Sequence, residues 1–351
     1  MAGFSPGFIG SLAAFEIGAR GGSVSPCGSS GVKRVMSIRF PNVDRRMGLG
    51  VGLDLPWGAA IGFERDPEVG DRIAPRVLRY LERHVDDFNY LFVSWQPRGR
   101  NRLDLADYVD VWDDLFARIP SWPVRALHQT AFNLGALEPY DTTALIDFTN
   151  GLIERYGLAW VNEDLGLWSL HGRPLPYPLP PYLTDAGLAA SIRNTARVQE
   201  ALVAPLLVEF PGFSDGTSFF MGSMHGYDFF RRVVEDTGSP ATLDTGHLLS
   251  YQWLCGKRGE ALFDDLERLP LEHCFEIHLS GCAIKDGRFM DYHHGILMDE
   301  QLELLTRLLP LCPNARGVTY EDPKFSREGV LTKRSVPNVE RLKAMTRAWA
   351  A

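Results

Sequence analysis

The segment 241–247, which reads ATLDTGH, joins a short apolar run to an aspartate and a histidine. A run of this kind is typical of a buried strand in a parallel sheet, and Asp244 stands where that strand ends. His247 follows Asp244 by three residues across the turn, so both side chains can approach two neighbouring metal ions, with Asp244 as the bridge. Other apolar runs along the chain also end in metal-ligand residue types.

Eight short apolar runs alternate with amphipathic stretches that have the period of an α-helix. We predict strands at 48–53, 90–93, 124–128, 159–161, 205–209, 241–244, 274–278 and 317–321. We predict helices at 73–85, 105–118, 142–156, 186–202, 227–237, 259–268 and 299–309. Alternating strands and helices indicate a parallel sheet, and eight strands are the number that closes a (β/α)8 or TIM barrel.

The start of the chain differs in composition from the rest. Residues 18–32 (GARGGSVSPCGSSGV) are small and rich in glycine and serine, so they offer too little apolar surface to order themselves. We therefore expect residues 1–46 to form a flexible or loosely packed N-terminal extension and residues 47–351 to form a single TIM-barrel catalytic domain. The extension lacks the continuous apolar region of a secretory signal, and translation from Met36 or Met47 is an alternative.

The composition of the chain indicates which partners and which cellular compartment to expect. A chain of 351 residues with 45% hydrophobic content can bury a large core, and its net charge of −8 disfavours a nucleic-acid partner. No apolar run approaches about 18 residues, so we expect no membrane span. The five cysteines form no CxxC pair, which is typical of reduced thiols in the cytoplasm (Cys27, Cys255, Cys274, Cys282 and Cys312).

Imidazoles and carboxylates gather where the predicted strands end, which in a TIM barrel is one shared mouth. The candidates are His128, Glu209, Asp244, His247, His278, Asp291, His293 and Glu321. Taken singly, His128 or Glu209 is more typical of a structural residue than of a ligand. Together, so many buried polar groups would be very costly unless metal ions balance their charge. A ligand set without cysteine suits iron or manganese and tolerates zinc.

Several motifs follow one another in a recognisable order: 128–135 (HQTAFNLG), 162–165 (NEDL), 176–180 (PYPLP), 208–209 (VE), 243–247 (LDTGH), 276–281 (EIHLSG), 291–293 (DYH) and 320–322 (YED). In order and spacing they resemble the DUF692 family of multinuclear non-heme iron-dependent oxidases, whose best-known members modify cysteine in ribosomally made peptides, as in methanobactin biosynthesis. The resemblance covers roughly residues 48–325 and places the family among the xylose-isomerase-like TIM barrels, which include the endonuclease IV type of DNA repair enzyme.

The resemblance implies a cofactor of about two or three iron ions that share carboxylate bridges. The first ion would be held by His128 and Glu209, the second by Glu209, Asp244, His278 and Glu321, and the third by Asp244, His247, Asp291 and His293. Glu209, Asp244 and His278 are the catalytic candidates.

This chain departs from the family pattern at three places. The family's S-E-H-L motif reads NEDL at 162–165, so Asp164 replaces a histidine ligand of the first metal with a shorter, anionic one. Residues 54–57 read DLPW where family members carry an arginine and a histidine, and Phe210 follows Glu209 in place of an asparagine. Substrate contacts are therefore expected to differ from those of characterised members.

The resemblance implies an O2-dependent oxidoreductase that modifies cysteine, or another residue, of a ribosomally synthesised precursor peptide. Many family members act together with a small recognition protein. Two alternatives share the barrel: an endonuclease IV-like hydrolase, in which three zinc ions activate water against a phosphodiester, and a sugar isomerase. The negative net charge and the proline-rich segment 175–181 favour the oxidase. A binding protein without catalysis is disfavoured by the number of ligand residues.

Overall fold

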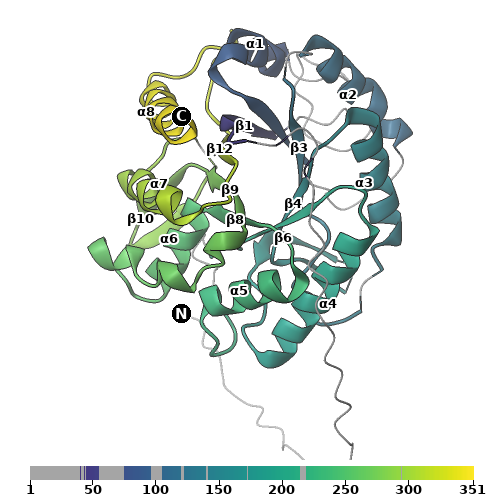
Figure 1. The fold of residues 1–351 in the computed structure, drawn as a ribbon, viewed down its shortest axis with the longest axis vertical. Coiled ribbons are helices and arrows are strands. Elements are labelled where there is room, and N and C mark those ends of the chain that lie inside the picture. Colours follow the sequence, from purple (N-terminus) through teal and green to yellow (C-terminus); the bar gives the residue numbers. More distant parts are fainter. Residues whose placement is uncertain are drawn as a thin grey trace, which may run out of the picture. The chain divides into compact units, whose positions relative to one another are not determined.

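The computed structural model describes residues 40, 43, 45–54, 75–95, 105–119, 122–139, 141–171, 173–213, 219–293 and 295–351. Within them, eight parallel strands close into a barrel in the order β1-β12-β9-β8-β7-β4-β3-β2, with helices around the outside (Figure 1). The predicted (β/α)8 barrel is confirmed. Residues 1–39 lie outside the described part, so the predicted N-terminal extension stays a prediction over that range.

Every predicted strand overlaps a strand of the barrel. The eight are β1 (Gly48–Asp54), β2 (Tyr90–Trp95), β3 (Arg125–Gln129), β4 (Val161–Asp164), β7 (Leu206–Glu209), β8 (Ala241–Asp244), β9 (Cys274–Leu279) and β12 (Gly317–Glu321). The largest displacement is at β4, which was predicted at 159–161. Its last three residues are polar and therefore resemble a loop in sequence, yet all four residues of the strand are buried.

Six of the seven predicted helices are present: α1 (Pro75–Arg83), α2 (Ala106–Arg118), α3 (Thr143–Tyr156), α4 (Asp185–Ala201), α5 (Gly226–Thr237) and α7 (Asp299–Leu311). The prediction of a helix at 259–268 is wrong. That segment forms two short 3-10 helices, η3 (Gly259–Phe263) and η4 (Leu266–Arg268), because Asp265 between them adopts a left-handed backbone with φ 64°. The described residues also include the 3-10 turns η2 (Val85–Asp87) and η5 (Leu271–His273).

Two helices were not predicted. Helix α8 (Val336–Ala350) packs against β1, and α6 (Thr245–Leu254) begins directly after β8. Eight consecutive residues of α6 are buried, so it lacks the one-sided apolar pattern from which a surface helix is inferred. The Asp244 carboxylate caps this helix by accepting a hydrogen bond from the His247 amide at 2.8 Å. None of the described helices has the length and apolar character that crossing a bilayer requires.

Two antiparallel hairpins interrupt the alternation of strands and helices. One joins β5 (Leu167–Leu170) to β6 (Arg173–Leu179), and the other joins β10 (Cys282–Lys285) to β11 (Arg288–Asp291). In the second hairpin Cys282 pairs with Asp291. The hairpin therefore returns the chain to the level at which β9 ends, and it carries Asp291 back to the mouth of the barrel.

Aromatic residues fill the end of the barrel opposite that mouth. Tyr90, Trp160 and Phe275 belong to one buried cluster there, and Val43 joins it. Phe40 also packs against this cluster, with its ring stacked on that of Phe275 at a centroid distance of 3.6 Å. Residues within the predicted 1–46 extension thus cover the base of the barrel, while the mouth is left to polar side chains.

Glycines in the strands make room for the Tyr90 ring. A Cβ added at Gly50 of β1 would lie 2.3 Å from Tyr90 Cζ, and one added at Gly317 of β12 would lie 2.4 Å from the Tyr90 hydroxyl. No substituent fits at either distance. Because β1 pairs with both β2 and β12, these glycines allow a large ring to cross the interior without pushing the strands apart.

We predict that Gly50→Ala lowers the free energy of unfolding by about 1–3 kcal/mol, because its methyl group must displace the buried ring. The change is measured by urea denaturation. Gly52→Ala on the same strand is the control, since its Cβ meets its nearest atoms at 3.1 Å and should cost less. An equal decrease in the free energy of unfolding for the two variants, or no decrease for Gly50→Ala, would contradict this account of the barrel interior.

Candidate metal centre

The nine predicted metal ligands lie at the C-terminal mouth of the barrel. Six stand on barrel strands, one each on β3, β4, β7, β8, β9 and β12: His128, Asp164, Glu209, Asp244, His278 and Glu321. The other three come from the segments that follow, with His247 in the first turn of α6, Asp291 at the end of β11 and His293 just after it. Strand ends therefore supply the floor of the site, and a helix and a hairpin supply one side.

Ligand atoms of these residues form four overlapping groups, and within each group they lie within 4.8 Å of one another. The groups are His128-Glu209-His278, Asp164-Glu209-His247, Asp244-His278-Glu321 and His247-Asp291-His293. Each of the nine residues belongs to at least one group, and Glu209, His247 and His278 belong to two. The shared members make the groups one continuous cluster.

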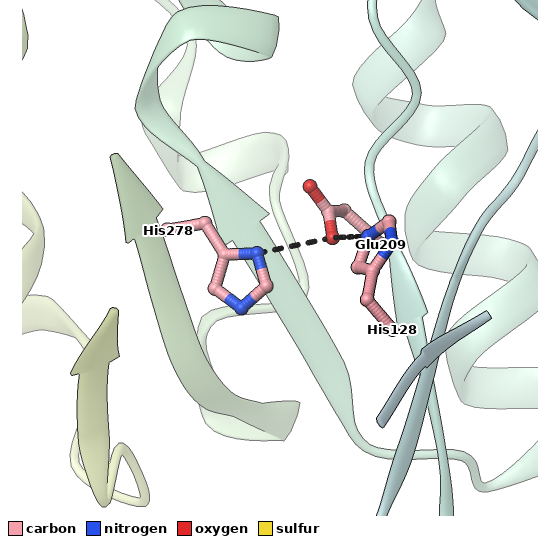
Figure 2. Close-up of side chains that lie close together, drawn as sticks. All are labelled: His128, Glu209 and His278. Atoms are coloured by element: carbon pink, nitrogen blue, oxygen red, sulfur yellow. Dashed lines mark hydrogen bonds and ion pairs between the residues drawn. The ribbon is translucent and has the colours of Figure 1, made fainter. Parts of the chain in front are cut away.

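Glu209 lies at the centre of the cluster. Its Oε2 is 3.2 Å from His128 Nε2 and 3.2 Å from His278 Nδ1, so the carboxylate stands between the two rings (Figure 2). Its Oε1 is 3.4 Å from His247 Nδ1. One carboxylate with separate neighbours on its two oxygens is suited to bridging two metal ions.

Asn162 and Thr242, which sequence reasoning missed, hold Glu209 from below. The Asn162 amide donates a hydrogen bond to Glu209 Oε2, and Asn162 Oδ1 accepts one from the Thr242 hydroxyl at 2.7 Å. Both residues are completely buried. The signal was present in the sequence, because each stands two residues before a predicted ligand on its own strand, and residues two apart on a strand face the same side.

Asp291 joins the hairpin to the cluster. Its Oδ2 is 3.2 Å from His247 Nε2 and 3.4 Å from His293 Nε2, while its Oδ1 accepts a hydrogen bond from the Ser280 hydroxyl at 2.9 Å. His247 Nδ1 is 2.8 Å from the carbonyl oxygen of Phe210, which leaves Nε2 for a metal ion. His293 is at the rim, with a side chain 43% exposed.

Both contacts of Asp164 with the cluster histidines are long. Its Oδ2 is 3.8 Å from His128 Nε2 and its Oδ1 is 3.7 Å from His247 Nδ1. The side chain is buried and faces the other ligands, as expected for a residue in a ligand position. Its short reach, however, keeps it farther from its neighbours than Glu209 is.

Burial and mutual repulsion control ionisation in the cluster. Burial, with the charge of Glu209, raises the pKa of Asp164 to about 6. Burial likewise raises the pKa of Asp244 to about 7. Burial lowers the pKa of His128, but its hydrogen bond to Glu209 and the charge of Glu209 outweigh that effect and raise the pKa to about 9. Without a metal ion, His128 is therefore protonated at neutral pH and Asp244 is partly protonated.

The cluster meets the requirements of a metal site. Asp244 Oδ2 and His278 Nδ1 are buried and, within the described part of the chain, have no hydrogen-bond partner. In that same part, the ion pairs of these carboxylates are formed with histidines, not with lysine or arginine. Divalent cations would satisfy both the unpaired atoms and the excess negative charge. Imidazole and carboxylate donors suit iron, manganese or zinc.

Comparison with known proteins agrees with this geometry. The family model of the RiPP precursor modification enzyme MbnB/TglH/ChrH, where RiPP denotes a ribosomally synthesised and post-translationally modified peptide, matches residues 114–324. The matched range contains all nine predicted ligands. A UPF0276 protein of Paraburkholderia phytofirmans is 34% identical over 168 residues, which are 46% of this chain and 50% of the relative. This chain therefore spans about half the length of that curated relative.

Solved structures resemble the chain at the level of the fold. The catalytic domain of a β-amylase from Paenibacillus polymyxa has a TM-score of 0.50 and 8% identity, covering 87% of this chain and 99% of that one. A xylose isomerase domain protein from Alicyclobacillus acidocaldarius has a TM-score of 0.46 and 16% identity, covering 86% of this chain and all of that one. At 8% identity, the similarity to the β-amylase domain concerns the barrel fold alone.

The protonation of the ligands predicts how metal binding depends on pH. Asp244 and His128 have raised pKa values in the folded protein, so their contributions to stability are lost as the pH rises through about 7 and about 9 respectively. Metal ions require the deprotonated forms and so bind more tightly as the pH rises. The melting temperature of zinc-loaded protein should therefore exceed that of metal-free protein by a growing margin between about pH 6 and pH 9.

Scanning calorimetry with and without zinc measures this margin. In Asp244→Asn, whose side chain cannot ionise, the difference in melting temperature should increase less with pH. In the control Asp286→Asn, which lies in an exposed turn, the pH dependence of that difference should be unchanged. A margin that stays constant or shrinks as the pH rises would show that the cluster does not exchange protons for metal.

Proposed function

We infer the function of this chain from the family to which it belongs, the RiPP precursor modification enzymes MbnB/TglH/ChrH. We propose that it is a multinuclear non-heme iron-dependent oxidoreductase that uses O2 to modify cysteine, or another residue, in a ribosomally synthesised precursor peptide. The observation that carries this proposal is the continuous cluster of four ligand groups centred on Glu209 at the barrel mouth. We further propose that a small recognition protein presents the peptide.

We propose three metal positions within the cluster. His128, Glu209 and Asp164 would hold the first ion, Glu209, Asp244, His278 and Glu321 the second, and His247, Asp291 and His293 the third. Asp244 is grouped with His278 and Glu321, and its Oδ1 accepts the His247 amide hydrogen, so we assign it to the second ion. When bound, iron would lower the pKa of a substrate thiol and supply electrons to O2.

The surrounding residues keep the ligands oriented. Asn162 holds Glu209, Ser280 holds Asp291, and the Phe210 carbonyl holds the ring of His247. Ligands fixed in this way lose little conformational freedom when a metal ion binds. The partly exposed His293 marks the side of the cluster that faces solvent, and we propose that the peptide approaches there.

We predict that Asp244→Ala abolishes O2 uptake on a cysteine-containing peptide. The change removes a ligand at the centre of the cluster, so metal binds less tightly and the negative charges of the neighbouring carboxylates repel one another. Oxygen consumption and peptide mass are measured on protein prepared and loaded with iron anaerobically. Asp147→Ala, at an exposed position of α3, is the matched control and should keep full activity.

The same assay separates the proposal from a hydrolase. An endonuclease IV-like enzyme would use zinc, would need no O2 and would cleave DNA at abasic sites. Nicking of abasic DNA by zinc-loaded protein, together with no O2 uptake on any cysteine peptide, would overturn the proposal.

We predict that Asp164→His raises the occupancy of the first metal position. An imidazole reaches farther than the aspartate, whose oxygens stay 3.7 Å or more from the neighbouring imidazole nitrogens. Iron per chain, determined by elemental analysis after anaerobic purification, should increase relative to the unchanged protein. Asp164→Asn serves as the control and should not increase it. An equal iron content in all three proteins would show that residue 164 does not limit occupancy.

A further inference from the structure

Glu276 lies directly beneath the candidate metal centre but is not one of its nine ligands. It precedes His278 by two residues on β9, so both side chains face the barrel interior. Its side chain is completely buried. A carboxylate in such a position is costly unless donors and a counter-charge surround it.

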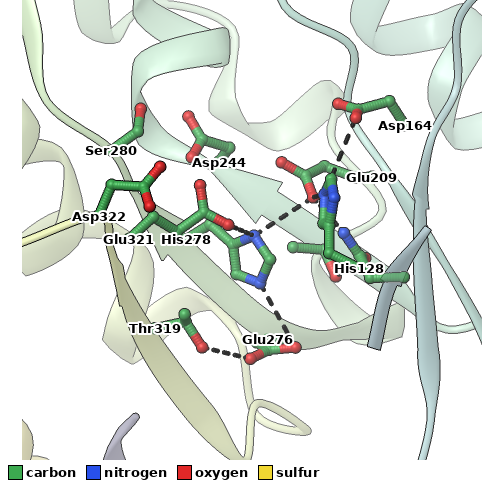
Figure 3. A network of polar contacts seen from close by, with 12 residues as sticks. His128, Asp164, Glu209, Asp244, Glu276, His278, Ser280, Thr319, Glu321 and Asp322 are labelled. Atoms are coloured by element: carbon green, nitrogen blue, oxygen red, sulfur yellow. Dashed lines mark hydrogen bonds and ion pairs between the residues drawn. The ribbon is translucent and has the colours of Figure 1, made fainter. Parts of the chain in front are cut away.

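Three neutral donors from other parts of the barrel fix Glu276. The Tyr90 hydroxyl donates to Oε1 at 2.9 Å, and the Trp160 indole donates to Oε2 at 2.9 Å. Thr319 on β12 also donates to Oε1 (Figure 3). The Thr319 hydroxyl is 2.7 Å from that of Tyr90. The carboxylate is therefore held from three directions.

The barrel interior is shaped to bring Tyr90 to this position. Gly50 and Gly317 lack the Cβ atoms that would collide with the Tyr90 ring and hydroxyl. The hydrogen bond from Tyr90 to Glu276 thus requires glycine on β1 and on β12, because a larger residue would displace the Tyr90 side chain. Such a specific arrangement around a residue outside the ligand set indicates a defined role for Glu276.

The Glu276 carboxylate also lies next to the ring of His278. Nε2 of this imidazole is 3.4 Å from Glu276 Oε2, which is a charge contact and not a hydrogen bond, because neither ring nitrogen has a hydrogen-bond partner within the described part of the chain. Nδ1 is 3.1 Å from Glu321 Oε1 and 3.2 Å from Glu209 Oε2. The ring stands between the carboxylates of the metal centre on one side and Glu276 on the other (Figure 3). Phe92 packs against the ring with a centroid distance of 4.8 Å, which restricts its tilt.

We propose that Glu276 is a positioning residue that presents Nδ1 of His278 to the metal ion shared with Glu209 and Glu321. A carboxylate on the far nitrogen keeps that nitrogen as the N–H donor and leaves the other free to bind metal. The proposal rests on the metal centre of the proposed function. It does not depend on the substrate or on the use of O2.

Zinc affinity tests the proposal without a peptide or O2. Glu276→Gln keeps the size of the side chain but removes the carboxylate, and it should weaken zinc binding about 10–100-fold in competition with a chelator. Tyr90→Phe removes one hydrogen bond to Glu276 and keeps the charge, so its affinity should stay much closer to that of the unchanged protein. Glu272→Gln, at an exposed position just before β9, is the matched control and should have no effect.

Two results would overturn the proposal: unchanged zinc affinity in Glu276→Gln, or an equal loss in Tyr90→Phe. The latter would mean that Glu276 only holds the barrel together. Because zinc affinity is measured in place of activity, this test of Glu276 remains valid even if the protein has no oxidase activity.

Nitrogen NMR of the unchanged, zinc-loaded protein gives a second readout, which is independent of whether the variants fold. With 15N-labelled histidine, the signal of His278, assigned by its loss in His278→Ala, should show the proton on Nε2 and the metal on Nδ1. A proton on Nδ1 would overturn the proposal.

Discussion

Five carboxylates and four imidazoles occupy one mouth of this barrel, in groups whose ligand atoms lie within 4.8 Å of one another. The cost of bringing these groups together is the constraint on which the surrounding structure depends. Burial and the charges of nearby carboxylates raise the pKa of Asp244, and the histidines balance only part of the negative charge. Metal ions would offset the repulsion and bind the unpaired ligand atoms, and the family that the chain belongs to is consistent with a centre of this kind.

The layers of the barrel interior follow from the same constraint. Aromatic side chains fill the base, buried amide, hydroxyl and carboxylate groups form a middle layer, and the ligands form the mouth. Asn162 connects the middle layer to Glu209, and Glu276 lies between its three donors and His278. Each layer orients the one above it, so the position of a ligand depends on the buried polar residues beneath it, on its own strand or on a neighbouring one.

The sequence alone predicted most of the barrel and all nine cluster members, because buried strands and strand-end ligands leave local patterns. It did not predict α6, whose residues are buried on every side, or the hairpin that returns Asp291 to the mouth. It placed β4 too early, since a buried polar strand end resembles a loop. Asn162, Thr242 and Glu276 were missed because their local signal, a place two residues before a ligand on the same strand, does not show which residues on other strands they contact.

The central claim is that the cluster is a multinuclear iron centre. The most direct test is the metal content of the protein purified without oxygen, determined by mass spectrometry and compared with protein carrying Glu209→Ala. The account predicts more than one iron ion per chain in the unchanged protein and a marked loss in the variant, because Glu209 contributes to two of the four groups. Zinc as the only metal, no metal at all, or the same iron content in both proteins would contradict it.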